Sequence, residues 1–213
     1  ARPRLTNYQN IKHHLYGFQN VKRNFSTGDW LKLAIKKIAE VKKRDKIPIL
    51  VGGTGLYFKA ILEGLVKIPN IPIQLRSKIR NLHKSLSQKV FYQKLLILDL
   101  KLKNKIVSTD SQRSIRAYEV KKFTKISILD WFKNTNSNFD ESQFLKILID
   151  YPREELILKI NLRTEEMIKM GAIKEVKKFI KLKVPRNKSV NKAIGISEIK
   201  EYLDKKKELT EIK

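Results

Sequence analysis

The stretch "IPILVGGTGLYFKAILEGL", residues 47–65, decides the predicted fold. Its first five residues, 47–51, are apolar and typical of a buried strand, and they lead directly into two glycines at 52–53. The apolar side chains of residues 54–62 then recur at helical spacing, and Gly64 is expected to stop this helix. A strand, a glycine turn and a helix in this order are typical of a parallel α/β sheet.

The glycine turn itself has two interpretations. Glycines let the backbone approach a ligand closely, and the free N–H groups at the start of the next helix favour an anion. Thr54 would add a hydroxyl group to such a site. Alternatively, the turn is purely structural and Thr54 is the N-cap of the helix. The spacing does not decide between them, because the Gly-Lys-Ser/Thr ending of a phosphate-binding loop occurs nowhere in the chain.

Outward from this stretch, the sequence predicts an α/β core interrupted by helices. A helix is expected after Ser26, because Ser26 and Asp29 fit a capping box. Further helices are expected over residues 74–87, 88–98 and 110–123, after Pro152, near Gly171 and from about Ile196, with a second strand over 144–150. We therefore predict an α/β core of residues 1–66 and 144–213 that carries a helical insertion of residues 67–143.

Composition favours a polyanionic partner. The 213 residues include 47 Lys and Arg against 21 Asp and Glu, a formal net charge of +26. The alternative is the lysine-rich usage of an AT-rich genome. The absence of cysteine excludes disulfides, thiolate zinc sites and cysteine nucleophiles. No apolar run is long enough to span a membrane, so we expect a cytoplasmic protein without a membrane partner.

Several charged side chains are candidates for phosphate binding. Arg76 and Arg80 share a helix face, and Arg113 and Arg116 are neighbours at helical spacing. The alternative is a solvated basic face, with Asp110 as an ordinary N-cap. After the predicted second strand, Arg163 and Lys159 form another basic pair at helical spacing.

Six segments, in order along the chain, resemble the tRNA dimethylallyltransferases, also called tRNA isopentenyltransferases. They are "IKHHLYGF" at 11–18, "FSTGDW" at 25–30, residues 47–65, "DSQRSIRAYEV" at 110–120, "REELILKINLRTEEMIKMGAIKEV" at 153–176 and "KAIGISEI" at 192–199. The resemblance implies transfer of a dimethylallyl group from dimethylallyl diphosphate to N6 of the adenine beside the anticodon of tRNA, at position 37. It also implies that the adenine is flipped out of the stack.

The same resemblance implies a P-loop-type parallel-sheet core with a helical insertion that grips the anticodon stem-loop. It implies a monomer that uses Mg²⁺, whose ligands would lie outside this chain. Arg163 matches a catalytic arginine that holds the diphosphate. The residues that match tRNA-binding positions are Thr54, Arg76, Asp110, Ser111, Gln112, Arg113, Ser114, Lys192, Ala193, Ile194, Gly195, Ile196 and Ser197. Ile196 stands where the family has tyrosine, and Ser197 stands where it has a basic residue.

The ends of the chain suggest a fragment of such an enzyme. In the family, the phosphate-binding loop and the aspartate general base lie upstream of the segment that resembles Ala1–Pro3, and a further tRNA-binding helix follows the region of Lys213. We therefore expect that the first sheet strand is missing and that this chain alone is inactive. The alternative is a decayed gene product that retains at most RNA binding. A nucleotide kinase with a P-loop core is disfavoured by the segments at 110–120 and 153–176.

Overall fold

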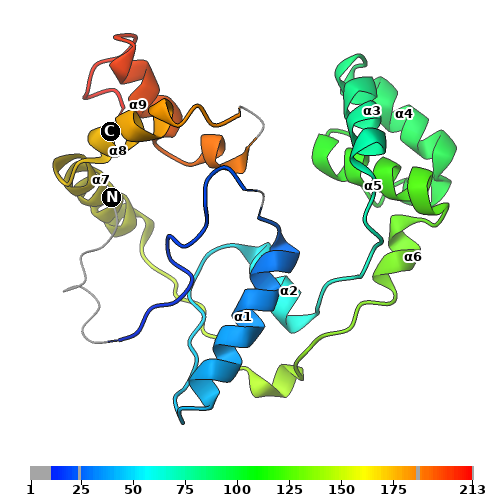
Figure 1. Cartoon of the computed structure of the whole chain (residues 1–213), viewed down its shortest axis with the longest axis horizontal. Coiled ribbons are helices and arrows are strands. Elements are labelled where there is room, and N and C mark those ends of the chain that lie inside the picture. Colours follow the sequence, from blue (N-terminus) through cyan, green and yellow to red (C-terminus); the bar gives the residue numbers. More distant parts are fainter. Residues whose placement is uncertain (1–10, 24, 186–187, 213) are drawn as a thin grey trace. The chain divides into compact units, whose positions relative to one another are not determined.

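The protein is described by a computed structural model covering residues 11–23, 25–185 and 188–212 (Figure 1). The chain divides into two compact units. The central unit is Gly53–Phe144, and the split unit joins Ala1–Gly52 to Leu145–Lys213. The terminal segments used in the fragment prediction, Ala1–Pro3 and Lys213, lie outside the described residues.

Helix α1, Thr27–Lys42, begins as its sequence predicts. The Ser26 hydroxyl oxygen accepts a hydrogen bond from the Asp29 backbone N–H at 3.1 Å. The Asp29 carboxylate accepts in return from the Ser26 backbone N–H at 3.0 Å, which completes the capping box. Leu31, Ala34 and Ile38 lie one helical turn apart along the buried face of α1, as the apolar spacing predicts.

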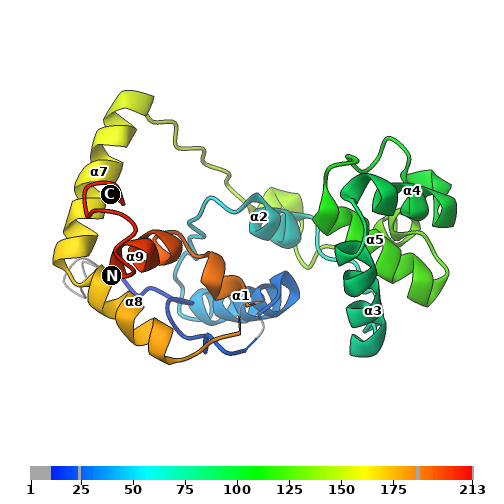
Figure 2. The same cartoon turned by 90° about the horizontal axis from the view of Figure 1, so that it is seen from above.

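The central unit is helical, and its helices α3 to α6 gather together in both views (Figures 1 and 2). Its elements are α2 (Gly55–Leu62), α3 (Ile73–Lys84), α4 (Gln88–Leu98), η2 (Leu100–Leu102), α5 (Ser111–Thr124), α6 (Ile128–Phe132) and η3 (Glu141–Gln143). The predicted helices at 74–87, 88–98 and 110–123 are therefore confirmed, with ends that shift by three residues at most. The core cluster of this unit consists of Ile71, Leu95, Leu102, Ile106, Ala117, Val120 and Ile128.

Gly64 ends the region of α2, as the sequence predicts. Its φ of +84° lies in the left-handed region, which side chains rarely adopt. A Cβ at Gly64 would overlap the carbonyl oxygen of Asn136 and lie 2.5 Å from its carbonyl carbon. The Ser137 hydroxyl donates to the Ile61 carbonyl oxygen at 3.3 Å, so this loop is joined to the last turn of α2.

Neither segment predicted as a strand belongs to a sheet among the residues that the structure describes. Residues 47–51 have no regular structure, and Ile47, Ile49 and Val51 are each more than 80% exposed, at 86%, 81% and 82%. Residues 145–150 are also without regular structure, and Leu148 is 93% exposed. The apolar pattern identifies a segment with the composition of a strand, but a strand also needs a neighbouring strand with which to form hydrogen bonds. The predicted sheet therefore stays a prediction.

Within the described residues 145–185 and 188–212, the split unit forms three helices and one short 3₁₀ turn. They are α7 (Arg153–Lys169), α8 (Ala172–Lys181), η4 (Ser189–Lys192) and α9 (Ile196–Leu203), close to the predicted starts. Ala172, Val176 and Ile199 form a small core between α8 and α9. Gly171, with φ of +103°, precedes α8, and a Cβ there meets no described atom within 4 Å.

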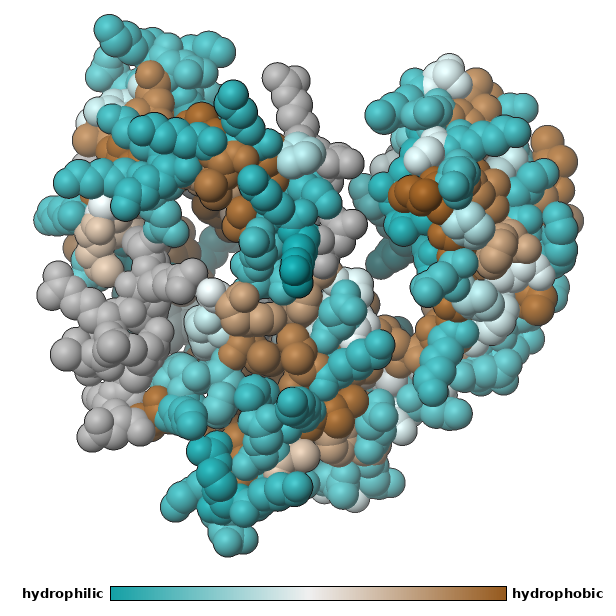
Figure 3. Space-filling model, viewed as in Figure 1, coloured by the Kyte–Doolittle hydropathy of each residue, from teal (hydrophilic) through white to brown (hydrophobic). Residues whose placement is uncertain are grey.

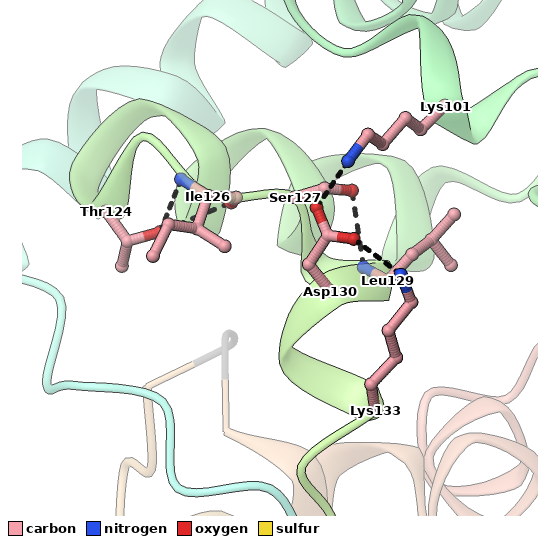
Figure 4. A network of polar contacts seen from close by, with 7 residues as sticks. All are labelled: Lys101, Thr124, Ile126, Ser127, Leu129, Asp130 and Lys133. Atoms are coloured by element: carbon pink, nitrogen blue, oxygen red, sulfur yellow. Dashed lines mark hydrogen bonds and ion pairs between the residues drawn. The ribbon is translucent and has the colours of Figure 1, made fainter.

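Hydrophilic residues cover much of the face drawn in Figure 3, with apolar patches between them. One carboxylate of the central unit, Asp130 on α6, lies between two lysines (Figure 4). Lys101 Nζ donates to it at 2.7 Å and Lys133 Nζ at 3.2 Å, and these hydrogen bonds hold the pKa of Asp130 below its ordinary value.

Candidate nucleic-acid interface

The start of α5 presents two of the predicted RNA-binding side chains to solvent. Asp110 is the N-cap of this helix, because its carboxylate accepts from the Arg113 backbone N–H at 2.9 Å. It also pairs with the Arg113 guanidinium at 3.3 Å, yet that side chain is 74% exposed. Gln112 is exposed and Ser111 is half-buried. The N-cap interpretation of Asp110 is thus confirmed, and Gln112 and Arg113 remain accessible to a ligand.

Ser114 has a different place from its neighbours. Its side chain is fully buried, and its hydroxyl accepts from Gln88 Nε2 at 3.3 Å. The same Gln88 amide donates to the Ser108 carbonyl oxygen at 2.8 Å, and its oxygen lies 2.9 Å from His83 Nε2. Ser114 therefore anchors the start of α5 to α4 in the free protein rather than facing solvent.

A buried carboxylate joins α3 to α5. Glu119 on α5 is 1% exposed, and three arginines surround it. Its ion pairs are with Arg76 at 3.6 Å, Arg80 at 3.3 Å and Arg116 at 3.7 Å. We call these three residues the arginine cluster. Their side chains are 40%, 54% and 44% exposed, so solvent reaches the cations but not the anion between them.

The positive charges around Glu119 outnumber its single negative charge. A buried carboxylate needs a partner, since an unpaired ion inside a protein is strongly unfavourable. Three guanidinium charges exceed that need and leave the group with a net charge of +2. Burial lowers the pKa of Arg116, while Glu119 acts in the opposite direction. The Arg76 Nε atom is buried and has no hydrogen-bond partner among the described residues.

Sequence reasoning found the arginines but missed Glu119. The helical spacing identifies Arg76 with Arg80 and Arg113 with Arg116. It does not predict a buried glutamate, because a glutamate in a basic amphipathic helix is ordinarily solvent-exposed. The available signal is that Glu119 lies between Ala117 and Val120, both of which are fully buried.

The glycine turn is open to solvent. Thr54 is the N-cap of α2, as one interpretation predicts, but its side chain makes no capping hydrogen bond. Within the described part of the chain, a Cβ at Gly52, Gly53 or Gly55 would meet no atom within 4 Å. Neither a crowded neighbour nor a positive φ requires glycine at these three positions. The ligand interpretation of the turn stays a prediction.

The segment from Lys192 to Ser197 caps α9. Gly195 has φ of +89°, and its N–H donates to Glu198 Oε2 at 2.9 Å. The Ser197 hydroxyl donates to the same oxygen at 3.0 Å. Ile196 packs on the small core of α8 and α9, whereas Ile194 is fully exposed. Lys192 and Ala193 are exposed as well.

Arg163 lies on α7 and is exposed. None of residues 153–169, all of which are described, is buried. Lys159, its expected basic neighbour, places its Nζ 4.2 Å from the ring centroid of Tyr151, a cation–π distance. The predicted site residues thus divide between the units, with Thr54, Arg76 and the start of α5 in one and Arg163 with the Lys192 segment in the other.

The described residues offer no ready metal site. Among them, no group of three or more His, Asp and Glu side chains could hold a metal ion. No helix in the same part of the chain is long and apolar enough to cross a membrane.

The family model and the relatives that match this chain point to the same family. The family model described as IPP transferase matches residues 1–213. A tRNA dimethylallyltransferase of Pelagibacter ubique is 57% identical over 204 residues, which are 96% of this chain and 65% of that protein. A tRNA dimethylallyltransferase of Rickettsia felis is 37% identical over 195 residues, 91% of this chain and 63% of that protein. The chain thus spans a little under two thirds of the length of these relatives.

Solved structures agree with this similarity. A crystal structure of the tRNA isopentenylpyrophosphate transferase of Bacillus halodurans is 28% identical with a TM-score of 0.59, and the match covers 99% of this chain and 65% of that one. A eukaryotic dimethylallyltransferase acting on tRNA is 21% identical with a TM-score of 0.76, covering 96% and 52%. At that identity, the second likeness supports a shared fold and nothing more.

Proposed function

The chain belongs to the IPP transferase family, and from that premise we propose that its protein transfers a dimethylallyl group from dimethylallyl diphosphate to N6 of adenine 37 in tRNA. The single observation that carries this proposal is the 57% identity with a tRNA dimethylallyltransferase over 96% of the chain. The anticodon stem-loop is the proposed macromolecular partner, and the monomer is the proposed form.

In the proposed reaction, the adenine N6 forms a bond to C1 of the dimethylallyl group. The bond from C1 to the diphosphate oxygen breaks, the diphosphate leaves with the electron pair, and N6 releases one proton to the solvent. Arg163 is proposed to bind the diphosphate and to stabilise the negative charge that grows on it as it leaves. The Arg163 side chain is exposed on α7, so a diphosphate can reach it, which supports this role.

Mg²⁺ is part of the expectation for this family, as a counter-charge for the diphosphate. Among the described residues, no group of three or more His, Asp and Glu side chains could hold a metal ion. We therefore assign no step of the reaction to the metal.

Binding of tRNA is proposed to use the exposed cations and amides of the matched segments. Gln112 and Arg113 are accessible at the start of α5, and Arg76 is partly exposed on α3. Arginine forks suit phosphate oxygens, and a glutamine amide suits a base edge. The net charge of +26 supports a nucleic-acid partner through the release of counterions.

We also propose that segments 47–51 and 144–150 are strands of a P-loop-type parallel sheet. The support is their apolar composition and the exposure of Ile49 and Ile147, at 81% and 76%. Apolar side chains gain about 25 cal/mol per Å² when a neighbouring strand or helix removes them from water.

The proposed activity can be tested with the complete gene product. Radiolabelled dimethylallyl diphosphate is incubated with a tRNA that carries adenine 37, and with the same tRNA carrying guanine there. Label in the first RNA and not the second is the expected result. Binding of both RNAs without label in either would instead favour an RNA-binding protein without transferase activity.

The role of Arg163 has its own test. Arg163→Ala is expected to lower kcat/KM for dimethylallyl diphosphate by about 10²- to 10³-fold, the usual effect of removing one charge-stabilising group. The affinity for tRNA should be unchanged. Lys169→Ala, which removes an exposed cation from the last turn of the same helix, is the matched control and should leave kcat/KM as it is.

A further inference from the structure

The arginine cluster and Glu119 have properties that the proposed function does not require. A single carboxylate would be satisfied by one or two cations, yet three guanidinium groups from two helices converge on it. The carboxylate is inaccessible at 1% exposure, while each arginine keeps 40% or more of its side chain exposed. A ligand that approaches this surface therefore meets cations whose counter-ion lies behind them.

The ion pairs leave donors for a second partner. Arg80 donates to Glu119 through Nε at 3.3 Å, and Arg116 reaches it through one terminal nitrogen. Arg76 Nε lies 3.6 Å from the carboxylate as an ion pair without a hydrogen bond. A guanidinium has five N–H donors in a planar fork, so a contact through Nε uses only one of them. Because the carboxylate holds the side chains in place, less conformational entropy is lost when the forks bind an anion.

We propose that Glu119 is a positioning residue that orients Arg76, Arg80 and Arg116 as one binding site for backbone phosphates of an RNA. Phosphate oxygens match the remaining donors, since bidentate contacts between arginine and phosphate are short and charge-assisted. The net charge of +2 matches two adjacent phosphodiesters, each with one negative charge. An RNA is favoured over other polyanions because the proposal rests on the proposed function, in which the partner is tRNA.

Removing the charge of Glu119 separates positioning from simple attraction. Glu119→Gln keeps the shape of the side chain but raises the charge of the group from +2 to +3. If the arginines act only through their charge, RNA should bind more tightly. If Glu119 positions them, RNA should bind more weakly, because the amide NH₂ turns a donor towards guanidinium donors and releases the forks.

Asp130→Asn is the matched control. Asp130 lies in the same unit and also holds two cations, Lys101 at 2.7 Å and Lys133 at 3.2 Å (Figure 4). The substitution adds the same single positive charge to the same unit. Lysine is a flexible point charge that needs no fixed orientation, so this change should leave RNA affinity within about twofold or slightly tighter.

The measurement is the dissociation constant of the complete gene product for two RNAs, a tRNA anticodon stem-loop and a plain RNA duplex, at a fixed salt concentration. Glu119→Gln is expected to weaken both by about fivefold or more, the effect of losing charge-assisted contacts. Affinity equal to or above that of the unsubstituted protein would overturn the proposal. So would full displacement of either RNA by millimolar inorganic diphosphate, since the site would then serve a free anion.

A second variant decides the case if Glu119→Gln does not fold, as judged by circular dichroism. Arg80→Lys changes a side chain that is 54% exposed and keeps its charge. Loss of the fork alone should weaken RNA binding by about threefold, and no change would refute the inference. If both variants bind RNA as tightly as the unsubstituted protein and that protein transfers the label, this inference is rejected and the proposed function is kept. Weakened RNA binding without any label transfer would do the reverse, and no RNA binding at all would reject both.

Discussion

Replacing Gly64 by alanine should destabilise the junction between α2 and the loop at Asn136. The new Cβ would overlap the Asn136 carbonyl oxygen and lie 3.0 Å from the Ser137 nitrogen. Both neighbours are backbone atoms, so a side-chain rotation cannot relieve the overlap. The loop must move, and the hydrogen bond from the Ser137 hydroxyl to the Ile61 carbonyl oxygen at 3.3 Å moves with it.

Two contributions set the magnitude. An alanine in the left-handed region costs about 1–2 kcal/mol relative to glycine. The displaced loop and its hydrogen bond add about 1–2 kcal/mol. We expect a total of about 2–4 kcal/mol for Gly64→Ala, which is large for a single methyl group.

Gly171→Ala isolates the backbone contribution. Gly171 has φ of +103°, but a Cβ there meets no described atom within 4 Å. This variant should lose only the backbone contribution of about 1–2 kcal/mol.

Amide hydrogen exchange is the assay, because it reports local opening. The Glu63 N–H, which donates to the Lys59 carbonyl oxygen at 2.8 Å, should exchange about 30-fold faster or more in Gly64→Ala. The Met170 N–H, which donates to the Glu166 carbonyl oxygen at 2.8 Å, is the probe for Gly171→Ala. Equal losses at the two sites would refute the reasoning, since the overlap with Asn136 would then contribute nothing.

Four further outcomes are expected. Leu95→Ala should lower the free energy of unfolding of the central unit by about 2–5 kcal/mol in a urea titration, because Leu95 is fully buried in its core. Ser26→Ala should cost about 1 kcal/mol and shorten α1 by circular dichroism, since it removes the N-cap hydroxyl. The lowered pKa of Asp130 means that its pairing with Lys101 and Lys133 stabilises the fold above the ordinary pKa of 3.8 and is lost as the pH falls through the lower folded value. Asp130→Asn should therefore flatten the acid limb of a plot of melting temperature against pH. Finally, log affinity for RNA should fall linearly with log salt concentration, and a flat line would contradict an electrostatic interface.

Local signals made the helices predictable. The capping box at Ser26 and Asp29 acts within four residues, and the structure forms it as the sequence indicates. The helix at 88–98 has the predicted bounds because Ser87, whose hydroxyl accepts from the Val90 N–H, starts it. Such signals depend only on neighbours along the chain, so they survive in any tertiary context.

Contacts between distant residues were harder to predict. Glu119 is paired inside the fold with Arg80, 39 positions away, and helical spacing cannot predict a partner at that distance along the chain. Ser114 is buried and accepts a hydrogen bond from Gln88, 26 positions away. The segment at 47–51 has the composition of a strand, but pairing depends on a neighbour that its own residues do not identify.

The division of the chain also sets an order of events during synthesis. The central unit is a continuous segment, Gly53–Phe144, whereas the split unit needs residues from both sides of it. At about 5–20 residues per second, the ribosome takes about 5–20 s to pass through this segment. The helices around Leu95 can form within that interval, because their contacts are local. Ile47, Ile49 and Val51 are more than 80% exposed, so nascent protein at this stage is expected to be a substrate for chaperones that hold apolar segments.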